Sequence, residues 1–236
     1  MKVLYAGDSP AGGPANYLLG ILNSLRANYV HVPPGKTLRP GLFKKRFDAI
    51  ILSDFSKKDL PRDSEKALVG QLERGAGLLM VGGWGSFSGP FGGWQGSRVE
   101  KLLPVRCLKQ DDRVNFPGGA RIVSKKKHPM FQSLSFKNPP VICGLNAVRP
   151  KRESLVLLSA KKLAGGREYP LLIINPDPKK RAAALTTDLA PHWCGGLVDW
   201  GSRRVQLRVT PRISIEVGES YVRFVQSILK WLSDRA

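Results

Sequence analysis

The residues best suited to chemistry are His192 and Asp188, in the segment 186–196. A neutral imidazole can take up a proton near neutral pH, and a neighbouring carboxylate can orient it. The segment follows an apolar run typical of a buried strand, so both side chains are expected near a strand end. We take His192 and Asp188 as the candidate catalytic pair. In the alternative interpretation, Asp188 caps a turn and His192 packs against Trp193 and Trp200.

A second candidate site is the glycine-rich stretch from Val81 to Trp94, which also follows an apolar run. Glycine permits positive φ and lets a ligand approach the backbone closely, while the aromatic side chains could form apolar walls. The stretch contains no Cys, His, Asp, Glu, Lys or Arg, so it predicts the shape of a binding site without a catalytic group. The candidate ligand-binding residues here are Gly83, Trp84, Gly85, Ser86, Phe87 and Trp94.

Two further candidate ligand-binding residues, Asp8 and Asp54, stand at the ends of predicted strands. The first half of the chain alternates strands with helices, which indicates a parallel sheet with right-handed crossovers. Open sheets of this kind bind ligands outside the carboxyl ends of their strands. The predicted strands are 3–7, 29–32, 47–54 and 78–81, and the predicted helices lie around 17–25 and over 64–74.

The second half of the chain has a different pattern. Apolar runs follow one another closely, with connections too short for helical crossovers, so antiparallel hairpins are expected. A last helix is predicted over 219–234 because its apolar residues recur at helical spacing. We see no linker or internal repeat, so residues 1–236 are expected to form a single domain. The predicted runs are 121–123, 141–143, 155–158, 171–174 and 182–185.

The glycine-rich turn, the strand end at Asp54, the segment 188–193 and the closing helix together resemble the class I glutamine amidotransferase-like superfamily. Within it, the sequence is most similar to an uncharacterised branch often labelled putative glutamine amidotransferase. The resemblance implies an α/β, flavodoxin-like three-layer sandwich. With the hairpins expected from the residues, the fold prediction is a mainly parallel sheet with an antiparallel extension in the second half.

The resemblance also implies a catalytic Cys on a tight turn after the strand at 78–81, with a His and a Glu from a later strand end. Gly85 occupies the position where the Cys would stand. The expected His falls on His192, but Cys194 occupies the place of the Glu. We therefore expect a protein without glutaminase activity that binds a small polar ligand at the strand-end cleft. The sequence leaves open whether the protein catalyses a different reaction.

Two alternative functions remain open. One is a hydrolase that uses His192 and Asp188 to activate water or a substrate hydroxyl. The other is an interaction module, because the formal net charge of +20 could attract an acidic protein or a nucleic acid. The basic residues come as scattered pairs and triplets beside turns, and no nucleic-acid-binding motif is visible. A solvated basic surface is therefore favoured over a nucleic-acid partner, and a homo-oligomer is compatible with every alternative.

The remaining composition predicts neither a metal site nor a cofactor. The three cysteines are odd in number and widely spaced, which does not suggest a disulfide framework. No second ligand pair accompanies His192 and Cys194 at the spacing of a zinc site. The chain starts directly with a strand and has no apolar run of membrane-spanning length, so we expect a cytoplasmic location and no membrane partner.

Overall fold

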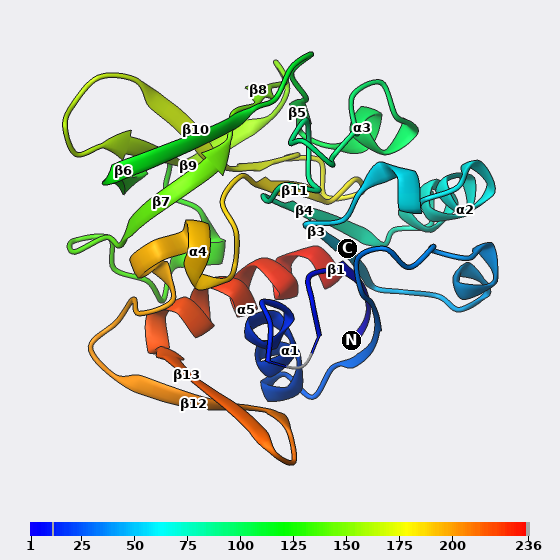
Figure 1. Cartoon of the computed structure of the whole chain (residues 1–236), viewed down its shortest axis with the longest axis horizontal. Helices are drawn as coiled ribbons and strands as arrows, with labels where there is room; N and C mark the ends of the chain where they lie inside the picture. The colour runs from blue at the N-terminus through cyan, green and yellow to red at the C-terminus, as the bar shows by residue number, and fades with distance from the viewer. Residues whose placement is uncertain (11, 235–236) are drawn as a thin grey trace.

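The computed structural model describes residues 1–10 and 12–234, and its centre is a nine-stranded sheet in the order β2-β1-β3-β4-β11-β10-β9-β6-β7 (Figure 1). The first five strands in that order run parallel, and the others pair antiparallel. The parallel strands are β1 (Lys2–Gly7), β2 (Asn28–Val32), β3 (Ala49–Ser53), β4 (Gly77–Val81) and β11 (Ala182–Leu185). The antiparallel strands are β6 (Arg113–Ser124), β7 (Val141–Asn146), β9 (Leu155–Lys162) and β10 (Glu168–Ile174).

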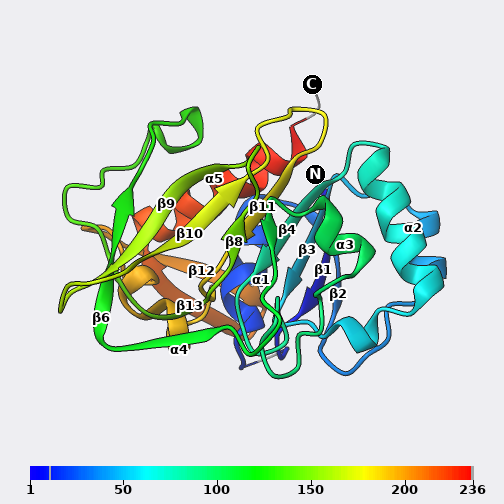
Figure 2. The same ribbon diagram turned by 90° about the horizontal axis from the view of Figure 1, so that it is seen from above.

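Helices cover both faces of the parallel half, which gives three layers (Figure 2). Successive side chains of a strand point to opposite faces of the sheet, so each strand contributes residues to both helix layers. Val3 and Tyr5 pack toward α1 and α5, whereas Leu4 and Ala6 pack toward α2 and η1. The structure therefore confirms the predicted α/β fold with its antiparallel extension. The helices are α1 (Ala15–Ser24), α2 (Arg62–Glu73), α3 (Arg98–Leu102), α4 (Pro191–Cys194) and α5 (Glu219–Ser233), with short 3₁₀ turns η1 (Pro40–Lys44), η2 (Lys57–Asp59), η3 (Pro129–Phe131) and η4 (Gly195–Leu197).

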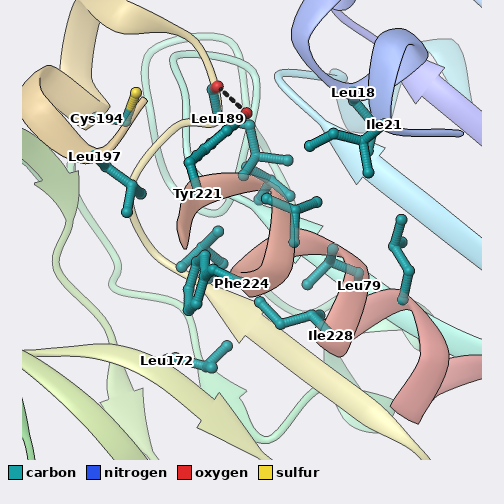
Figure 3. Close-up of a cluster of buried hydrophobic side chains, with 14 of the residues drawn as sticks. Leu18, Ile21, Leu79, Leu172, Leu189, Cys194, Leu197, Tyr221, Phe224 and Ile228 are labelled. Atoms are coloured by element: carbon teal, nitrogen blue, oxygen red, sulfur yellow. Dashed lines mark hydrogen bonds between the residues drawn. The ribbon is translucent and has the colours of Figure 1, made fainter. Parts of the chain in front are cut away.

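Helix α5 forms the centre of one of these layers (Figure 3). Tyr221, Phe224 and Ile228 recur at helical spacing and are almost fully buried. The Tyr221 hydroxyl donates a hydrogen bond to the carbonyl of Leu189 at 2.7 Å. Burying the ring and pairing its hydroxyl fixes the segment that follows β11, and this segment carries Asp188.

A hairpin formed by β12 (Arg204–Thr210) and β13 (Ile213–Gly218) was not predicted from the sequence. The hairpin packs on α1, where the Asn23 amide donates to the carbonyls of Arg208 and Val209 at 3.0 and 2.9 Å. Its strands alternate apolar with polar or charged residues, since only one face is covered, so neither strand forms a continuous apolar run. The short pair β5 (Val105–Arg106) and β8 (Arg149–Pro150) and the first half of β6 were not predicted either.

Candidate functional site

The strand order changes direction between β1 and β3, and open sheets bind ligands outside the carboxyl ends of their strands at such a point. The chain passes from β1 to β2 on one side and then to β3 on the other, so the connections leave in opposite directions at this point. Asp8 follows β1 directly and Asp54 follows β3. Both have positive φ, at 47° and 48°, which is uncommon for a residue other than glycine. The fold therefore places two of the predicted site residues in strained conformations at the carboxyl edge of the parallel strands.

Asp8, Asp54 and Asp188 form a group of interacting carboxyls at this edge. Burial and, less strongly, the charge of Asp54 raise the pKa of Asp8 to about 7, while hydrogen bonds from Tyr5 and Ser53 act in the opposite direction. The Tyr5 hydroxyl donates to Asp8 at 2.5 Å. Burial also raises the pKa of Asp188 well above its usual value, as does the charge of Asp8. Asp8 and Asp188 can therefore hold protons near neutral pH and donate hydrogen bonds as well as accept them.

The glycine-rich turn is anchored to the antiparallel half of the sheet by Asn146, the last residue of β7. Its side-chain oxygen accepts from the Gly83 backbone N–H at 2.9 Å, and its amide donates to the Gly83 carbonyl at 3.2 Å. The amide also donates to the buried carboxyl of Asp112 at 2.6 Å, and Asp112 accepts from the Ser88 N–H at 2.8 Å. Burial raises the pKa of Asp112 to about 6. Sequence reasoning missed both anchors.

Several glycines of the turn are required because the backbone of neighbouring strands leaves no room for a side chain. A Cβ at Gly85 would lie 2.9 Å from the backbone carbon and oxygen of Asp54. A Cβ at Gly82 would lie 2.1 Å from the carbonyl oxygen of Thr186. The Gly85 N–H instead donates to the Asp54 carboxylate, and the Ser86 hydroxyl accepts from the Asp54 N–H at 3.1 Å. The predicted residues Gly85, Ser86 and Asp54 are thus brought together.

The aromatic residues of the turn divide into two groups, which corrects the expectation that all of them form ligand walls. Phe87 and Trp94 are fully buried, and the Trp94 indole donates to the carbonyls of Phe55 and Gly85 at 2.9 and 3.1 Å. They support the turn from the core. Trp84 and Phe91 are 44% and 59% exposed, with ring centroids 6.2 Å apart. These two rings can contact a ligand.

The conformation after β4 also differs from the strand-to-helix turn that the resemblance implies. Residues 82–97 are all described and contain no helix, so the chain makes successive turns before α3. The helix N-terminus that would support a nucleophile on such a turn is absent from this stretch. Trp84 is exposed in this stretch, and the Arg113 guanidinium lies 4.3 Å from the centre of its ring.

A small pocket of about 200 Å³ opens beside the turn. Asp54 and Gly85 line it together with the exposed ring of Phe91, so it includes two of the predicted ligand-binding residues. The remaining lining comes from the segments that follow β2 and β3: Pro34, Gly35, Ser56, Lys58 and Asp59. Sequence reasoning missed these segments because only the strand order brings them to the turn.

The structure does not join His192 to Asp188. Asp188 accepts hydrogen bonds from the backbone N–H groups of Leu189 and Ala190, at 2.6 and 3.0 Å, in the manner of a turn cap. His192 lies exposed on the short helix α4, and it has no hydrogen bond within the described residues. The expected orientation of the imidazole by Asp188 is therefore wrong in this conformation, and Asp188 instead belongs with Asp8.

Neither a metal centre nor a membrane span is found in the described part of the chain. Across residues 1–10 and 12–234, no cluster of three or more His, Cys, Asp or Glu side chains has the arrangement of a metal site. Over the same residues, no helix is both long and apolar enough to cross a membrane.

Comparison with known proteins identifies a family and several related folds. The family model described as "Putative glutamine amidotransferase" matches residues 42–208. No curated protein matches the sequence. Cytoplasmic Protein STM3548 from Salmonella typhimurium has a similar structure, with 20% identity, 98% of each chain covered and a TM-score of 0.74. Cytoplasmic Protein STM1381 from Salmonella typhimurium LT2 has 22% identity over 99% of this chain and 100% of its own, with a TM-score of 0.75.

A more distant similarity is to Agd3, described as a novel carbohydrate deacetylase. It has 12% identity and a TM-score of 0.57 over 81% of this chain and 30% of that protein. At these identities, the solved structures show a shared fold and do not transfer an activity.

Proposed function

Since the chain belongs to the family described as "Putative glutamine amidotransferase", we propose that it retains the fold of that family but binds a small polar ligand without hydrolysing glutamine. The ligand site is the strand-end cleft at Asp8, Asp54 and the glycine-rich turn. The observation that carries the proposal is the packing of Gly85 against the backbone of Asp54.

The packing argues against nucleophilic chemistry at this turn. A cysteine at position 85 would place its Cβ 2.9 Å from two backbone atoms of Asp54 and 3.1 Å from the Phe55 nitrogen. Backbone atoms cannot move aside as a flexible side chain can, so a nucleophile here would require the end of β3 to shift. The serine that follows, Ser86, is buried and its hydroxyl already accepts from the Asp54 N–H.

The polar groups at the cleft favour a ligand that is rich in hydrogen-bonding groups. Asp54 and Asp59 supply carboxylate oxygens to the pocket, and Lys58 supplies a cation. The exposed face of Phe91 lines the same pocket, and Trp84 lies beside it. A few polar groups that converge beside an apolar wall are typical of small-molecule sites. A small ligand with several donors and acceptors fits a volume of about 200 Å³.

The absence of glutaminase activity is tested with the purified protein and glutamine, by measuring ammonia release. We expect no turnover above that of the Trp84→Ala variant or of buffer. Glutamine hydrolysis that scales with protein concentration and persists through purification would overturn this part of the proposal.

Ligand binding is tested by thermal shift against a panel of sugars, amino acids and small amides. A compound bound at the cleft should raise the melting temperature of the wild type and of Asp63→Asn, a control on the exposed surface of α2. Asp54→Asn should lose most of that shift, because the amide cannot replace the carboxylate charge. A panel hit that stabilises Asp54→Asn as strongly as the wild type, or a panel without any hit, argues against this cleft.

A further inference from the structure

A cavity of about 690 Å³ lies away from the strand-end cleft. It opens at the other edge of the parallel sheet, where β4 and β11 begin, and its floor includes Leu78 and Ala182 from these strands. Ala76 and Leu103 extend the apolar floor. Because the strands are parallel, this cavity is separated from Asp8 and Asp54 by the length of the sheet.

Charged side chains surround the apolar floor, and cations outnumber anions. The lining cations are Lys101, Lys151, Lys179, Lys180 and Arg181, and the lining anions are Glu73, Glu153 and Asp177. Asp177 pairs with Lys180 at 3.9 Å. The rim therefore has a net positive charge, which favours an anionic ligand.

Arg181 gives this charge a fixed position at the start of β11. Its side chain is only 12% exposed, and one terminal nitrogen lies 3.5 Å from the carboxylate of Asp234. Its Nε is buried and has no hydrogen-bond partner among the described residues. A buried donor without an acceptor is costly, and the guanidinium fork suits the paired oxygens of a carboxylate or phosphate. Arg181 lines the cavity, so its guanidinium can contact an oxyanion bound there, and a small rotation of the side chain would turn Nε toward the same oxygens.

The carbonyl end of α3 does not oppose an anion here, because Lys151 already engages it. The Lys151 ammonium donates to the carbonyls of Glu100 and Lys101 at 3.1 and 2.8 Å. These contacts offset the negative partial charge at the helix end. Lys101 and Lys179 are exposed and can contact a ligand at the rim.

We propose that this cavity binds a small oxyanion attached to an apolar body, with the oxyanion at Arg181 and the body against the apolar lining that includes Ala76, Leu78 and Leu103. Carboxylates and phosphates share the required chemistry. The site is independent of the strand-end cleft, and the proposal rests on the cation-rich rim, the apolar lining and the position of Arg181 in the cavity wall.

The proposal is tested by isothermal titration of the purified chain with four probes. 2-Naphthyl phosphate and 2-naphthoate carry both features, whereas 2-naphthol lacks the anion and inorganic phosphate lacks the apolar body. We expect at least one naphthyl anion to bind about tenfold or more tightly than either single-feature probe. The stronger of the two anions identifies the oxyanion class.

Variants locate the binding. Arg181→Gln should weaken the naphthyl anion about tenfold, and Ala76→Phe should block it by filling the floor. Arg121→Gln, an exposed site on β6, and Asp54→Asn, in the strand-end cleft, should leave the affinity unchanged. If Arg181→Gln does not fold, Lys179→Glu and Ala76→Phe decide the result. The proposal is overturned if the wild type binds neither anion saturably, if naphthol binds equally well, or if folded Arg181→Gln and Ala76→Phe both bind normally.

Discussion

At the scale of single residues, the turn after β4 is defined by what its glycines exclude. Gly82 and Gly85 lie against the backbone at the ends of β11 and β3, respectively. Asp54 completes the arrangement, because its carboxylate accepts the Gly85 N–H and its own N–H donates to Ser86. The glycines therefore give close packing between the turn and β3 instead of a place for a reactive side chain.

Gly85→Ala tests this packing. The added methyl group would meet the Asp54 backbone at 2.9 Å, and we expect a loss of about 1–3 kcal/mol in the free energy of unfolding. Urea unfolding measures the loss. Gly41→Ala is a suitable control, because a Cβ there has no atom within 4 Å. Equal stability of Gly85→Ala and the wild type would show that the turn can move away from β3.

The raised pKa of Asp8, also a property of a single residue, predicts that the stability of the folded chain depends on pH. Burial raises its pKa to about 7 in the folded chain, against about 3.8 for an ordinary Asp. Between pH 4 and 7 the folded state keeps a proton that the unfolded state has lost, so the contribution of Asp8 to stability falls as pH rises through this window. Above pH 7 the folded chain contains a buried charge.

Asp8→Asn removes that charge. We expect the variant to be more stable than the wild type at pH 8, on the order of 2 kcal/mol, and to show a weaker decline in stability between pH 4 and 7. Melting curves at several pH values measure both effects, with Asp63→Asn as the exposed control. A variant whose stability runs parallel to the wild type across this window would contradict the raised pKa.

At the scale of elements, the antiparallel strand β7 holds the turn that follows the parallel strand β4. Asn146 is fully buried and bonds both the N–H and the carbonyl of Gly83. Its backbone N–H also donates to the carbonyl of Thr186 at 2.9 Å. One residue thus links β7, the glycine-rich turn and the segment after β11, and the antiparallel extension supports the candidate site.

Asn146→Leu breaks this link with little change in volume. The Gly83 groups and the Asp112 carboxyl would lose their partners inside the protein, and each buried unsatisfied group costs about 1–3 kcal/mol. We expect a destabilisation of about 3 kcal/mol or more and faster hydrogen exchange at the amides of the turn. Asn28→Ala, on the exposed start of β2, should have a small effect. Unchanged exchange at Gly83 would show that Asn146 does not hold the turn.

At the scale of the whole molecule, the sheet and its helix layers bury two of the three cysteines. Cys107 and Cys194 are buried, and Cys143 is exposed on β7. Burial raises the pKa of the Cys107 and Cys194 thiols, which lowers their reactivity. The Cys194 thiol also donates to the Ala190 carbonyl at 2.8 Å.

Thiol titration with a chromogenic disulfide reports on this packing. We expect one thiol to react in the native chain and three after denaturation, with Cys143→Ser removing the native reaction. Rapid reaction of more than one thiol in the folded protein would indicate that the layers open readily. Binding of an acidic protein or a nucleic acid by the chain, which has a net charge of +20, remains a prediction. Such binding should weaken steeply as the salt concentration rises, and measuring affinity at several salt concentrations tests it.

The sequence by itself determined the features that depend on neighbours along the chain. The apolar runs of β1, β3 and β4, the helical stripe of α5 and the short hairpin connections are all visible as local periodicity. The family resemblance, carried by the turn and the segment 188–193, agrees with the family model over residues 42–208. The hairpin β12–β13 was not predicted because its half-covered strands alternate apolar with polar residues and lack a continuous apolar run.

Only the tertiary structure decided which side chains meet. It joined Asp188 to Asp8 rather than to His192, buried Phe87 and Trp94, and brought Asn146 to Gly83. These outcomes depend on strand order and on packing between distant segments, which local spacing does not encode. The stability of the folded chain comes from such non-local contacts. Residues whose side chains are suited to chemistry could therefore be identified from the sequence, but the residues that they contact could not.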